Sequence, residues 1–215
     1  MADPICPAGM VLQKPNDAVY PDEPAFCIGK TEVPQKNFMD FLRERFRTEY
    51  DEVRRMLAGN PHVAGDKKPA VYAKWDMARA YCQAMYPGGD LPTERQWENA
   101  CGSGTYCMAS DSSNRTEAIF NASGPADVGS TPVNPRGVRD MIGSVFEWMS
   151  DDGGDGYKRI SGLSWSNNFN LNLLALGLNS NFRSDDYDDH LGFRCAARPI
   201  IESPEKGTPK KPHKP

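Results

Sequence analysis

The sequence predicts an α+β fold in which two or three helices flank an irregular antiparallel sheet. Three features predict it: an amphipathic stripe over residues 33–57, a helix-capping sequence at Thr93, and short apolar segments toward the C-terminus. With 215 residues, 39% of them hydrophobic, and no internal repeat, the chain is long enough for one sizeable core. We expect one domain over residues 1–198. The end of the chain, ESPEKGTPKKPHKP, has no apolar side chain to bury, so we expect a disordered tail over residues 199–215.

Three helices are expected. In residues 33–57 the apolar positions recur on one face, with Arg and Glu between them, which predicts one long helix ending at Gly59. Those positions are Phe38, Phe41, Leu42, Phe46, Tyr50, Val53 and Leu57. A second helix is predicted over residues 74–85, because the PGG sequence at Pro87 stops it. A third begins at Thr93, where Thr93 and Gln96 have the spacing of a capping box.

Loops and strands are expected in the rest of the chain. Gly, Ser, Asn and Pro dominate residues 102–137, which predicts a long loop region. The apolar segments 145–148, 157–160 and 191–195 predict short strands. In the Asn-rich stretch 166–190, Phe169, Leu171 and Leu173 alternate with Asn, which predicts a half-buried strand followed by an acidic loop.

Charge and hydropathy exclude two classes of partner. The net charge is -4 and the isoelectric point is about 5.4, and Lys and Arg are scattered, so we expect no nucleic-acid partner. No apolar run approaches the length of a membrane span, so no membrane insertion is expected. The first residues, MADPICPAGMV, lack the charged and apolar regions of an export signal.

Six cysteines stand at positions 6, 27, 82, 101, 107 and 195. They include no CxxC spacing and lie far in sequence from the three histidines, which argues against a zinc site. Disulfides and free buried thiols both remain open, and six cysteines allow fifteen pairings. Disulfides would indicate an oxidising compartment or a virion surface.

A set of motifs carries a family resemblance. In order, the chain contains AGMV, KTEVP, DMARAYC, DLPTERQWENAC, PVNPRGVRDMIGSVFEW, ISGLSW and LGFRCA. Together they resemble the formylglycine-generating-enzyme-like (sulfatase-modifying factor) branch of the C-type lectin fold, over most of residues 8–198. Each motif alone is a weak signal, whereas seven in the family's order are a strong one. The resemblance implies an α+β fold whose N- and C-terminal strands lie close together.

The resemblance also implies a disulfide. Family members that have the bridge pair the cysteine of the AYC helix with that of the GFRC motif, which here match Cys82 and Cys195. Cys101 and Cys107 are close enough in sequence to close a local loop. Cys6 and Cys27 would then be the remaining pair.

The catalytic chemistry of the enzymes in this branch is not expected here. Those enzymes oxidise a substrate cysteine with a copper-binding pair of cysteines, and the matching positions fall at about Ser166 and Leu171. Neither residue supplies a thiolate for a soft metal. His190 has no nucleophile motif beside it, and the nearby aspartates are typical of a solvated loop. We therefore predict a protein that is not an enzyme and requires no cofactor.

A structural calcium ion is the one metal that the resemblance suggests. Family members place calcium at positions that match the side chains of Asp140 and Glu147 and the backbone carbonyls of Gly143 and Val145. The alternative is that Asp140 caps a turn while Glu147 pairs with a nearby Arg. Ser144 departs from the Asn that is usual at its position, which weakens the match.

The Asn-rich stretch further resembles the variable region of proteins diversified by retroelements, which form a non-enzymatic sub-branch of this fold. Those elements randomise the first two bases of AAY codons, which cannot yield Lys, Glu, Gln, Met or Trp. None of these five occurs between Ser166 and His190, although all occur elsewhere in the chain. The resemblance implies a hypervariable surface for a protein or cell-surface ligand. Its predicted contact residues are Asn167, Asn168, Phe169, Asn170, Asn172, Asn179, Asn181, Phe182, Asp185, Asp186, Tyr187, Asp188, Asp189 and His190.

Two classes of function remain open from the sequence. In the first, Tyr and Phe supply contact area and Asn, Ser and Asp supply adaptable hydrogen bonds, as in an antibody paratope. Scaffold positions would then be Leu171, Leu173, Leu176, Leu178 and Arg183. The second class is a calcium-dependent sugar binder of fixed specificity or an inactive homologue of the enzyme.

Overall fold

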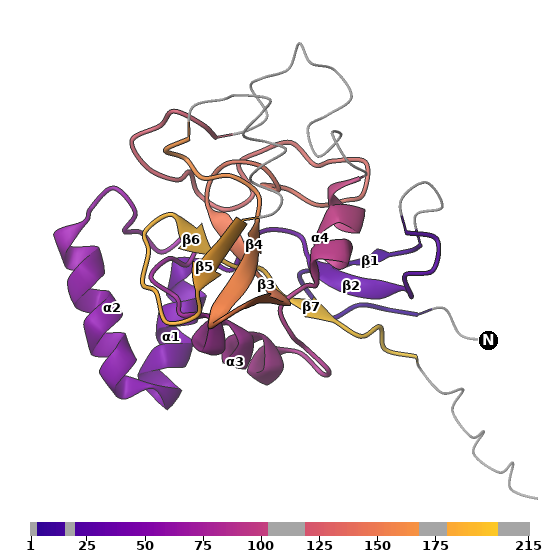
Figure 1. The fold of residues 1–215 in the computed structure, drawn as a ribbon, viewed down its shortest axis with the longest axis horizontal. Coiled ribbons are helices and arrows are strands. Elements are labelled where there is room, and N and C mark those ends of the chain that lie inside the picture. Colours follow the sequence, from indigo (N-terminus) through magenta and orange to yellow (C-terminus); the bar gives the residue numbers. More distant parts are fainter. Residues whose placement is uncertain (1–3, 16–19, 103–118, 168–179, 202–215) are drawn as a thin grey trace, which may run out of the picture.

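The computed structural model describes residues 4–15, 20–102, 119–167 and 180–201. Within them the chain forms four helices and two sheets, with strand orders β1-β2-β7 and β5-β4-β3-β6. Helices α1, α2 and α3 gather on one side of the four-stranded sheet, and long loops lie on the other side (Figure 1). The α+β prediction is confirmed.

The first helical region is two helices rather than one. Helix α1 spans Gln35–Arg45 and α2 spans Arg47–Gly59, with Phe46 between them in a non-helical conformation (φ -138°, ψ 68°). The predicted single helix was wrong because the apolar stripe continues through the break without Gly or Pro to mark it. The bend brings the Phe46 ring to 5.5 Å from that of Phe41, and only Val53 of α2 is buried.

The other two helices follow their predictions closely. Helix α3 spans Trp75–Met85 and buries Met77, Ala78, Tyr81 and Cys82. Helix α4 spans Glu94–Cys101 and begins with the predicted capping box: the Gln96 amide donates to Thr93 Oγ1, and the Thr93 amide donates to Gln96 Oε1. Gly102 ends α4 in the left-handed region, with φ 105°.

The smaller sheet joins the two ends of the domain. Strands β1 (Met10–Gln13) and β2 (Phe26–Gly29) are antiparallel, and β2 pairs with β7 (Ala196–Ala197). An isolated antiparallel bridge between Ile5 and Ile200 shows that the predicted disordered tail starts too early at residue 199, because Ile200 is hydrogen-bonded to the N-terminal segment; residues 202–215 of that tail lie outside the described residues. The expectation that the N- and C-terminal strands lie close together is confirmed.

The larger sheet contains β3 (Phe146–Gly154), β4 (Tyr157–Ser161), β5 (Ser180–Arg183) and β6 (Leu191–Gly192). Strands β3, β4 and β6 match the three predicted apolar segments, although β6 stops three residues early. Strand β5 falls inside the stretch expected to form the acidic loop. It pairs antiparallel with β4 and lies at the edge of the sheet. The alternation at residues 169–173 lies outside the described residues.

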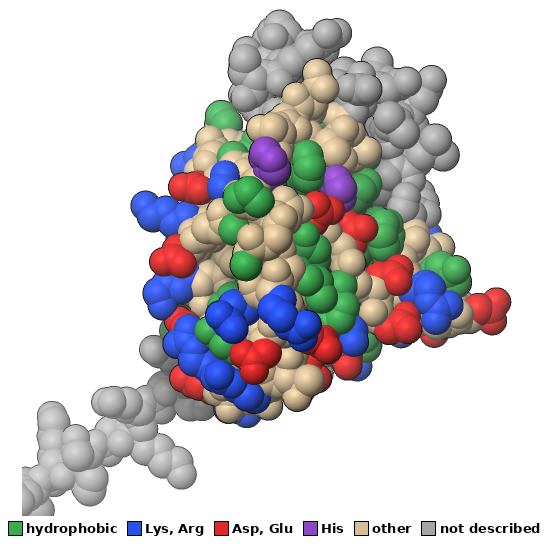
Figure 2. Space-filling view, turned by 90° about the vertical axis from the view of Figure 1, so that its left-hand side faces the viewer, with side chains coloured by type: hydrophobic (Ala, Val, Ile, Leu, Met, Phe, Trp, Pro, Cys, Tyr) green, Lys and Arg blue, Asp and Glu red, His purple; other side chains and the backbone are tan. Residues whose placement is uncertain are grey.

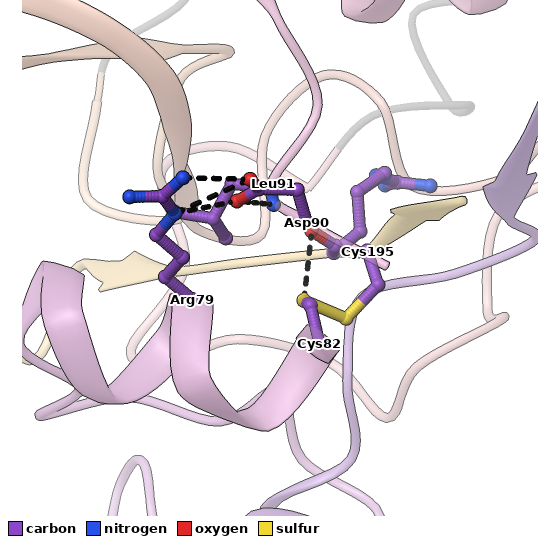
Figure 3. Close-up of a disulfide and its surroundings, with 6 residues drawn as sticks. Arg79, Cys82, Asp90, Leu91 and Cys195 are labelled. Atoms are coloured by element: carbon purple, nitrogen blue, oxygen red, sulfur yellow. Dashed lines mark hydrogen bonds and ion pairs between the residues drawn. A yellow bond between two sulfur atoms is a disulfide. The ribbon is translucent and has the colours of Figure 1, made fainter. Parts of the chain in front are cut away.

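One disulfide fixes α3 and another fixes the N-terminal segment. Cys82 on α3 is bonded to Cys195, with 5.4 Å between the Cα atoms, and Cys6 is bonded to Cys27 of β2. The Cys82–Cys195 bridge confirms the pairing that the resemblance implied, and Cys6–Cys27 is a pairing that the sequence had left open. Cys101 is also disulfide-bonded, while the expected partner Cys107 lies outside the described residues. Figure 3 shows the Cys82–Cys195 bridge beside the ion pair of Arg79 and Asp90, which places α3 against the chain leading into β7.

The main core lies between α1, α3 and the larger sheet. Phe38, Tyr81 and Phe193 meet edge to face, with ring centroids 5.4 to 6.2 Å apart. Trp148 of β3 and Ile160 of β4 are fully buried in the same cluster. This core holds α3 against the larger sheet, whose edge strand β5 begins the candidate site.

Candidate ligand-binding surface

The predicted binding segment is described in two parts, Asn167 and residues 180–190, and we call these residues the candidate surface. From the edge strand β5 the chain passes α2 and α3 and returns to the sheet at β6. Its path is fixed by main-chain hydrogen bonds: the amide of Trp75 donates to the Ser184 carbonyl at 3.1 Å, and that of Tyr72 donates to the Asp188 carbonyl at 3.0 Å. The segment is therefore held by backbone atoms of the domain.

Side chains of β5 alternate between solvent and core. Asn181 and Arg183 are exposed, whereas Phe182 is half-buried, its ring 6.4 Å from that of Phe146 and 6.5 Å from that of Trp148. Asp185 is exposed and pairs with Arg183 at 3.2 Å, and the hydrogen bond from the guanidinium lowers the pKa of the Asp185 carboxyl. Asn181 and Asp185 thus lie where a ligand can reach them, and Phe182 contributes to packing.

Tyr187 is fixed from both sides. Its hydroxyl donates to Glu52 Oε2 of α2 at 2.8 Å, and the Lys74 ammonium lies 4.4 Å from the centre of its ring. Burial, and then the hydrogen bond to Glu52, raises the pKa of the Tyr187 hydroxyl. Tyr187 is half-buried and packs against the main core. Its neighbour Asp186 is also half-buried.

Asp188, Asp189 and His190 form a compact polar group. His190 Nδ1 lies 2.7 Å from an oxygen of Asp189 and 3.2 Å from one of Asp188. The His190 ring stacks on that of Trp165, with centroids 4.6 Å apart and 11° between the planes. The other carboxylate oxygen of Asp189 accepts a hydrogen bond from the side-chain amide of Asn60 at 2.7 Å. Figure 2, which shows the face carrying α1 and α2, has histidine and acidic side chains next to one another.

Asn167 holds a turn at the start of the candidate surface. Its side-chain oxygen accepts hydrogen bonds from the backbone amide and the hydroxyl of Ser164, at 2.7 and 3.1 Å. Its backbone carbonyl accepts from the amide of Asn121. Asn167 is therefore a turn residue as well as a predicted contact. The remaining predicted contacts lie outside the described residues, and so do the predicted scaffold leucines: Asn168, Phe169, Asn170, Asn172 and Asn179, with Leu171, Leu173, Leu176 and Leu178.

The predicted calcium ligand Asp140 is engaged by donors of the chain. Its buried carboxylate accepts hydrogen bonds from the amide and hydroxyl of Thr131, at 3.0 and 2.8 Å, and from the amide of Gly129. Gly143 and Ser144, in the following turn, both have positive φ angles, of 78° and 62°. Asn tolerates that region better than Ser, which gives a physical reason for the Asn usual at position 144.

The other predicted carboxylate, Glu147, is paired with arginine. Arg194 Nε and Nη2 donate to its two oxygens at 2.6 and 2.7 Å, and the Trp97 indole adds a third donor at 2.9 Å. Arg194 Nη2 also donates to the carbonyl of Asp140 at 3.1 Å. These are the contacts of the alternative prediction, a capped turn and an ion pair. As arranged, both carboxylates already accept hydrogen bonds from donors of the chain, and calcium at Asp140, Gly143, Val145 and Glu147 stays an untested prediction.

A further buried carboxyl, Glu32, lies near this pair. It is 1% exposed, and neither of its carboxylate oxygens has a hydrogen-bond partner within the described residues. Burial, and then the charge of Asp140, raises the pKa of Glu32 well above its ordinary value, against the opposing effect of Arg194. Three carboxyls thus surround one guanidinium in the centre of the domain.

The positions that match the copper ligands contain no thiol in the part the structure describes. Ser166 is hydrogen-bonded through its hydroxyl to that of Ser164 at 3.1 Å, and Leu171 lies outside that part. No cysteine of the described ranges is free. Among the described residues, no helix is long and apolar enough to cross a membrane.

Several residues that position the candidate surface were not found from the sequence. They come from α2, from the segment between α2 and α3, and from the loop after β4: Glu52, Asn60, Tyr72, Lys74 and Trp165. Each lies outside the Asn-rich stretch in the sequence, and the fold brings it into contact with that stretch. Trp165 alone had a local signal, because it ends the ISGLSW motif that borders the stretch.

Comparison with known proteins identifies relatives over most of the chain. The family model of the sulfatase-modifying factor enzyme 1-like domain matches residues 8–199. Inactive C-alpha-formylglycine-generating enzyme 2 of Bos taurus is 30% identical over 156 residues, which cover 60% of this chain and 50% of the relative. Serine/threonine-protein kinase pkn1 of Chlamydia caviae is 38% identical over 98 residues, covering 44% of this chain and 16% of the kinase. The chain thus spans half or less of the length of these two relatives.

Enzymes also occur among the relatives. The formylglycine-generating enzyme of Mus musculus is 28% identical over 102 residues, covering 39% of this chain and 27% of the enzyme. Sequence similarity therefore connects the chain to active and inactive members alike.

Solved structures share the fold at low sequence identity. Treponema denticola variable protein 1 superimposes with a TM-score of 0.62 at 19% identity, covering 92% of this chain and 95% of that one. The Major Tropism Determinant I1 variant gives a TM-score of 0.52 at 12% identity, covering 94% of this chain and 55% of that one. One of them is titled a variable protein and the other a variant of a tropism determinant, and at these identities both share the fold with this chain. With the family model matched over residues 8–199, the chain belongs to the sulfatase-modifying factor enzyme 1-like family, in its C-type lectin fold.

Proposed function

We propose that this domain is a non-enzymatic binding protein, and that its ligand-contacting surface is built from the Asn-rich stretch 166–190, diversified by a retroelement. The observation that carries the proposal is the lack of thiols where the family's oxidases bind copper, at Ser166 and Leu171. Without a soft ligand pair, the metal that performs the oxidation has no site there. A domain of this fold that has lost the chemistry retains a rigid scaffold that can present loops.

The geometry of the candidate surface supports presentation rather than catalysis. Asn181 and Asp185 are exposed on a strand and a loop whose backbones are held by the sheet and by α3. A rigid support under exposed polar side chains lowers the entropy lost when a ligand binds. The absence of Lys, Glu, Gln, Met and Trp from the stretch supports diversification through AAY codons.

The ligand we propose is a protein or cell-surface structure. The exposed groups of the described part of the candidate surface are the amide of Asn181, the guanidinium of Arg183 and the carboxylate of Asp185, which suit a broad polar contact. One fold relative is named a tropism determinant, a role in target choice that such a surface could also fill.

The flanking DNA tests diversification directly. We expect a near-copy of the codons for residues 165–195, differing mainly at adenines, beside a reverse-transcriptase gene. A genome that encodes this chain without such a copy would contradict diversification and leave a binder of fixed specificity.

An activity assay tests the non-enzymatic part separately. The full chain, loaded with copper, should not oxidise a CxPxR peptide, whereas an active formylglycine-generating enzyme assayed in parallel should. Oxidation at enzyme-like rates would exclude the proposal, since the thiolate pair would then be unnecessary.

A further inference from the structure

We propose that Asp188, Asp189 and His190 form a binding site for a divalent transition-metal ion, of which Zn²⁺ is the probe of choice. One ligand atom from each residue lies within 4.8 Å of the others, and this is the one such group of three in the described ranges 4–15, 20–102, 119–167 and 180–201. The site is distinct from the calcium positions at Asp140 and Glu147, which lie in the loop before β3 and in β3 itself.

The donor atoms determine which metal fits. One imidazole nitrogen and two carboxylate oxygens form a mixed set that suits zinc and its neighbours in the first transition row. Calcium would need six to eight oxygens, which this group does not supply. Three protein ligands also leave a fourth position open for water or for a group of a bound ligand.

The distances already approach those of a metal site. Donor atoms bonded to one tetrahedral zinc ion are about 3.2 to 3.6 Å apart, given bonds of about 2.0 to 2.2 Å. His190 Nδ1 is 3.2 Å from the Asp188 oxygen, and 2.7 Å from that of Asp189. Bringing the 2.7 Å separation into the zinc range takes a shift of about half an ångström of the Asp189 carboxylate.

Groups outside the trio fix two of the three ligands. The stack on Trp165 sets the plane of the His190 ring, and the Asn60 amide holds one Asp189 oxygen at 2.7 Å, leaving the other directed at Nδ1. Asn60 is oriented in turn by the hydroxyl of Tyr72 at 3.1 Å. Such outer contacts orient ligands in known metal sites.

The charge of the group favours a cation. Asp188 and Asp189 are only 30% and 25% exposed. Within the described part of the chain their one ion-pair partner is His190, and no Lys or Arg nitrogen lies within 4.0 Å of either carboxylate. A divalent ion would balance two half-buried carboxylates better than one imidazole does.

Binding of Zn²⁺ to the metal-free full chain tests the site without any other ligand, so the result is independent of the proposed function. We expect one equivalent to bind by equilibrium dialysis, with Ca²⁺ unable to compete. The variants His190→Phe, which keeps a ring against Trp165, and Asp189→Asn should each bind roughly tenfold more weakly or worse. The controls His62→Gln, His213→Gln and Asp185→Asn should bind like the parent.

A readout on the unaltered chain covers the case in which the variants fail to fold. Imidazole nitrogen NMR should show the Nδ1 resonance of His190 shifting on addition of Zn²⁺, while that of His62 stays in place. No bound zinc, unchanged affinity in folded His190→Phe or Asp189→Asn, or an unmoved His190 resonance would each overturn the proposal.

Discussion

The guanidinium of Arg194 binds both carboxylate oxygens of Glu147, at 2.6 and 2.7 Å, with 0% and 1% of the two side chains exposed. Arg194 belongs to the LGFRCA motif and Glu147 to the segment GSVFEW, so the pair joins the end of the domain to the start of β3. The Arg194 guanidinium also donates hydrogen bonds to the backbone carbonyls of Gly29, Arg139 and Asp140. One side chain thereby connects both sheets and the loop before β3.

Removing one partner of this pair should destabilise the domain strongly. Arg194→Met leaves Glu147 charged and buried, and such uncompensated charges cost about 3 to 5 kcal/mol of unfolding free energy. We expect urea unfolding to show this loss of unfolding free energy for Arg194→Met. The double variant Arg194→Met, Glu147→Met should lose less, because no unpaired charge is left buried. Arg183→Met removes an exposed ion pair with Asp185 and serves as the control, for which no measurable loss is expected. Equal effects at the two arginines would contradict the structure.

Glu32 should make stability depend on pH. Its pKa is raised in the folded state from the ordinary 4.5, so the folded protein retains a proton that the unfolded chain releases. Stability from the neutral carboxyl is therefore complete below about pH 4.5 and is lost as the pH rises toward the folded pKa. Replacing Glu32 by Gln removes this loss. Thermal melts of the metal-free chain should show the variant gaining on the parent from pH 5 to pH 8, and a pH-independent difference would refute the assignment.

Substitution of Phe182 should cost far more stability than substitution of Asn181, although both are predicted ligand contacts. Phe182→Ser removes a half-buried ring from Phe146 and Trp148 and should cost about 1 to 3 kcal/mol. Asn181→Ser alters an exposed side chain and should change stability by no more than about 0.5 kcal/mol. Chemical unfolding of the two variants measures this. If Phe182→Ser left the free energy of unfolding unchanged, the ring would be shown to contribute to the binding surface rather than to the core.

The Cys82–Cys195 bridge should be a major source of stability. It closes a loop with a sequence separation of 113, and a bridge of that size contributes about 2 to 5 kcal/mol. The double variant Cys82→Ala, Cys195→Ala should melt at a lower temperature than the parent. Cys6→Ala with Cys27→Ala, whose separation is 21, is the matched control and should lose less. Recovery of Cys82 and Cys195 as free thiols in non-reducing peptide maps would disprove the bridge.

Calcium should not stabilise the domain. The carboxylates of Asp140 and Glu147 already accept hydrogen bonds from Thr131, Trp97 and Arg194. Adding millimolar Ca²⁺ to metal-free protein should leave its melting temperature unchanged, because a ligand raises stability only when it binds the folded state. A rise that Glu147→Gln abolishes would restore the calcium prediction.

The sequence predicted features that are encoded locally. The capping box at Thr93 and the PGG stop after α3 involve neighbouring residues, and both are confirmed. The family motifs added the Cys82–Cys195 pairing, which spacing alone left open. The break at Phe46 was missed because it depends on how α1 and α2 pack, and the apolar period does not change there.

The candidate site was predictable only in part for the same reason. Codon-level composition marked the stretch 166–190, but it could not distinguish exposed Asn181 from inward-facing Phe182, because a β5 strand was not expected there. Glu52, Asn60 and Trp165 position the candidate surface through hydrogen bonds between residues that are 24 or more positions apart in the sequence. No local sequence pattern indicates contacts over such separations.

The main-chain hydrogen bonds that hold residues 184–190 do not depend on which side chains those residues carry. The carbonyls of Ser184, Asp188 and His190 accept hydrogen bonds from the amides of Trp75, Tyr72 and Phe146, and every amino acid has such a carbonyl. If these three codons change, the backbone carbonyls remain, so these three hydrogen bonds stay available whatever side chains the positions carry. At these positions the backbone atoms hold the path of the chain, while the side chains determine which groups a ligand meets.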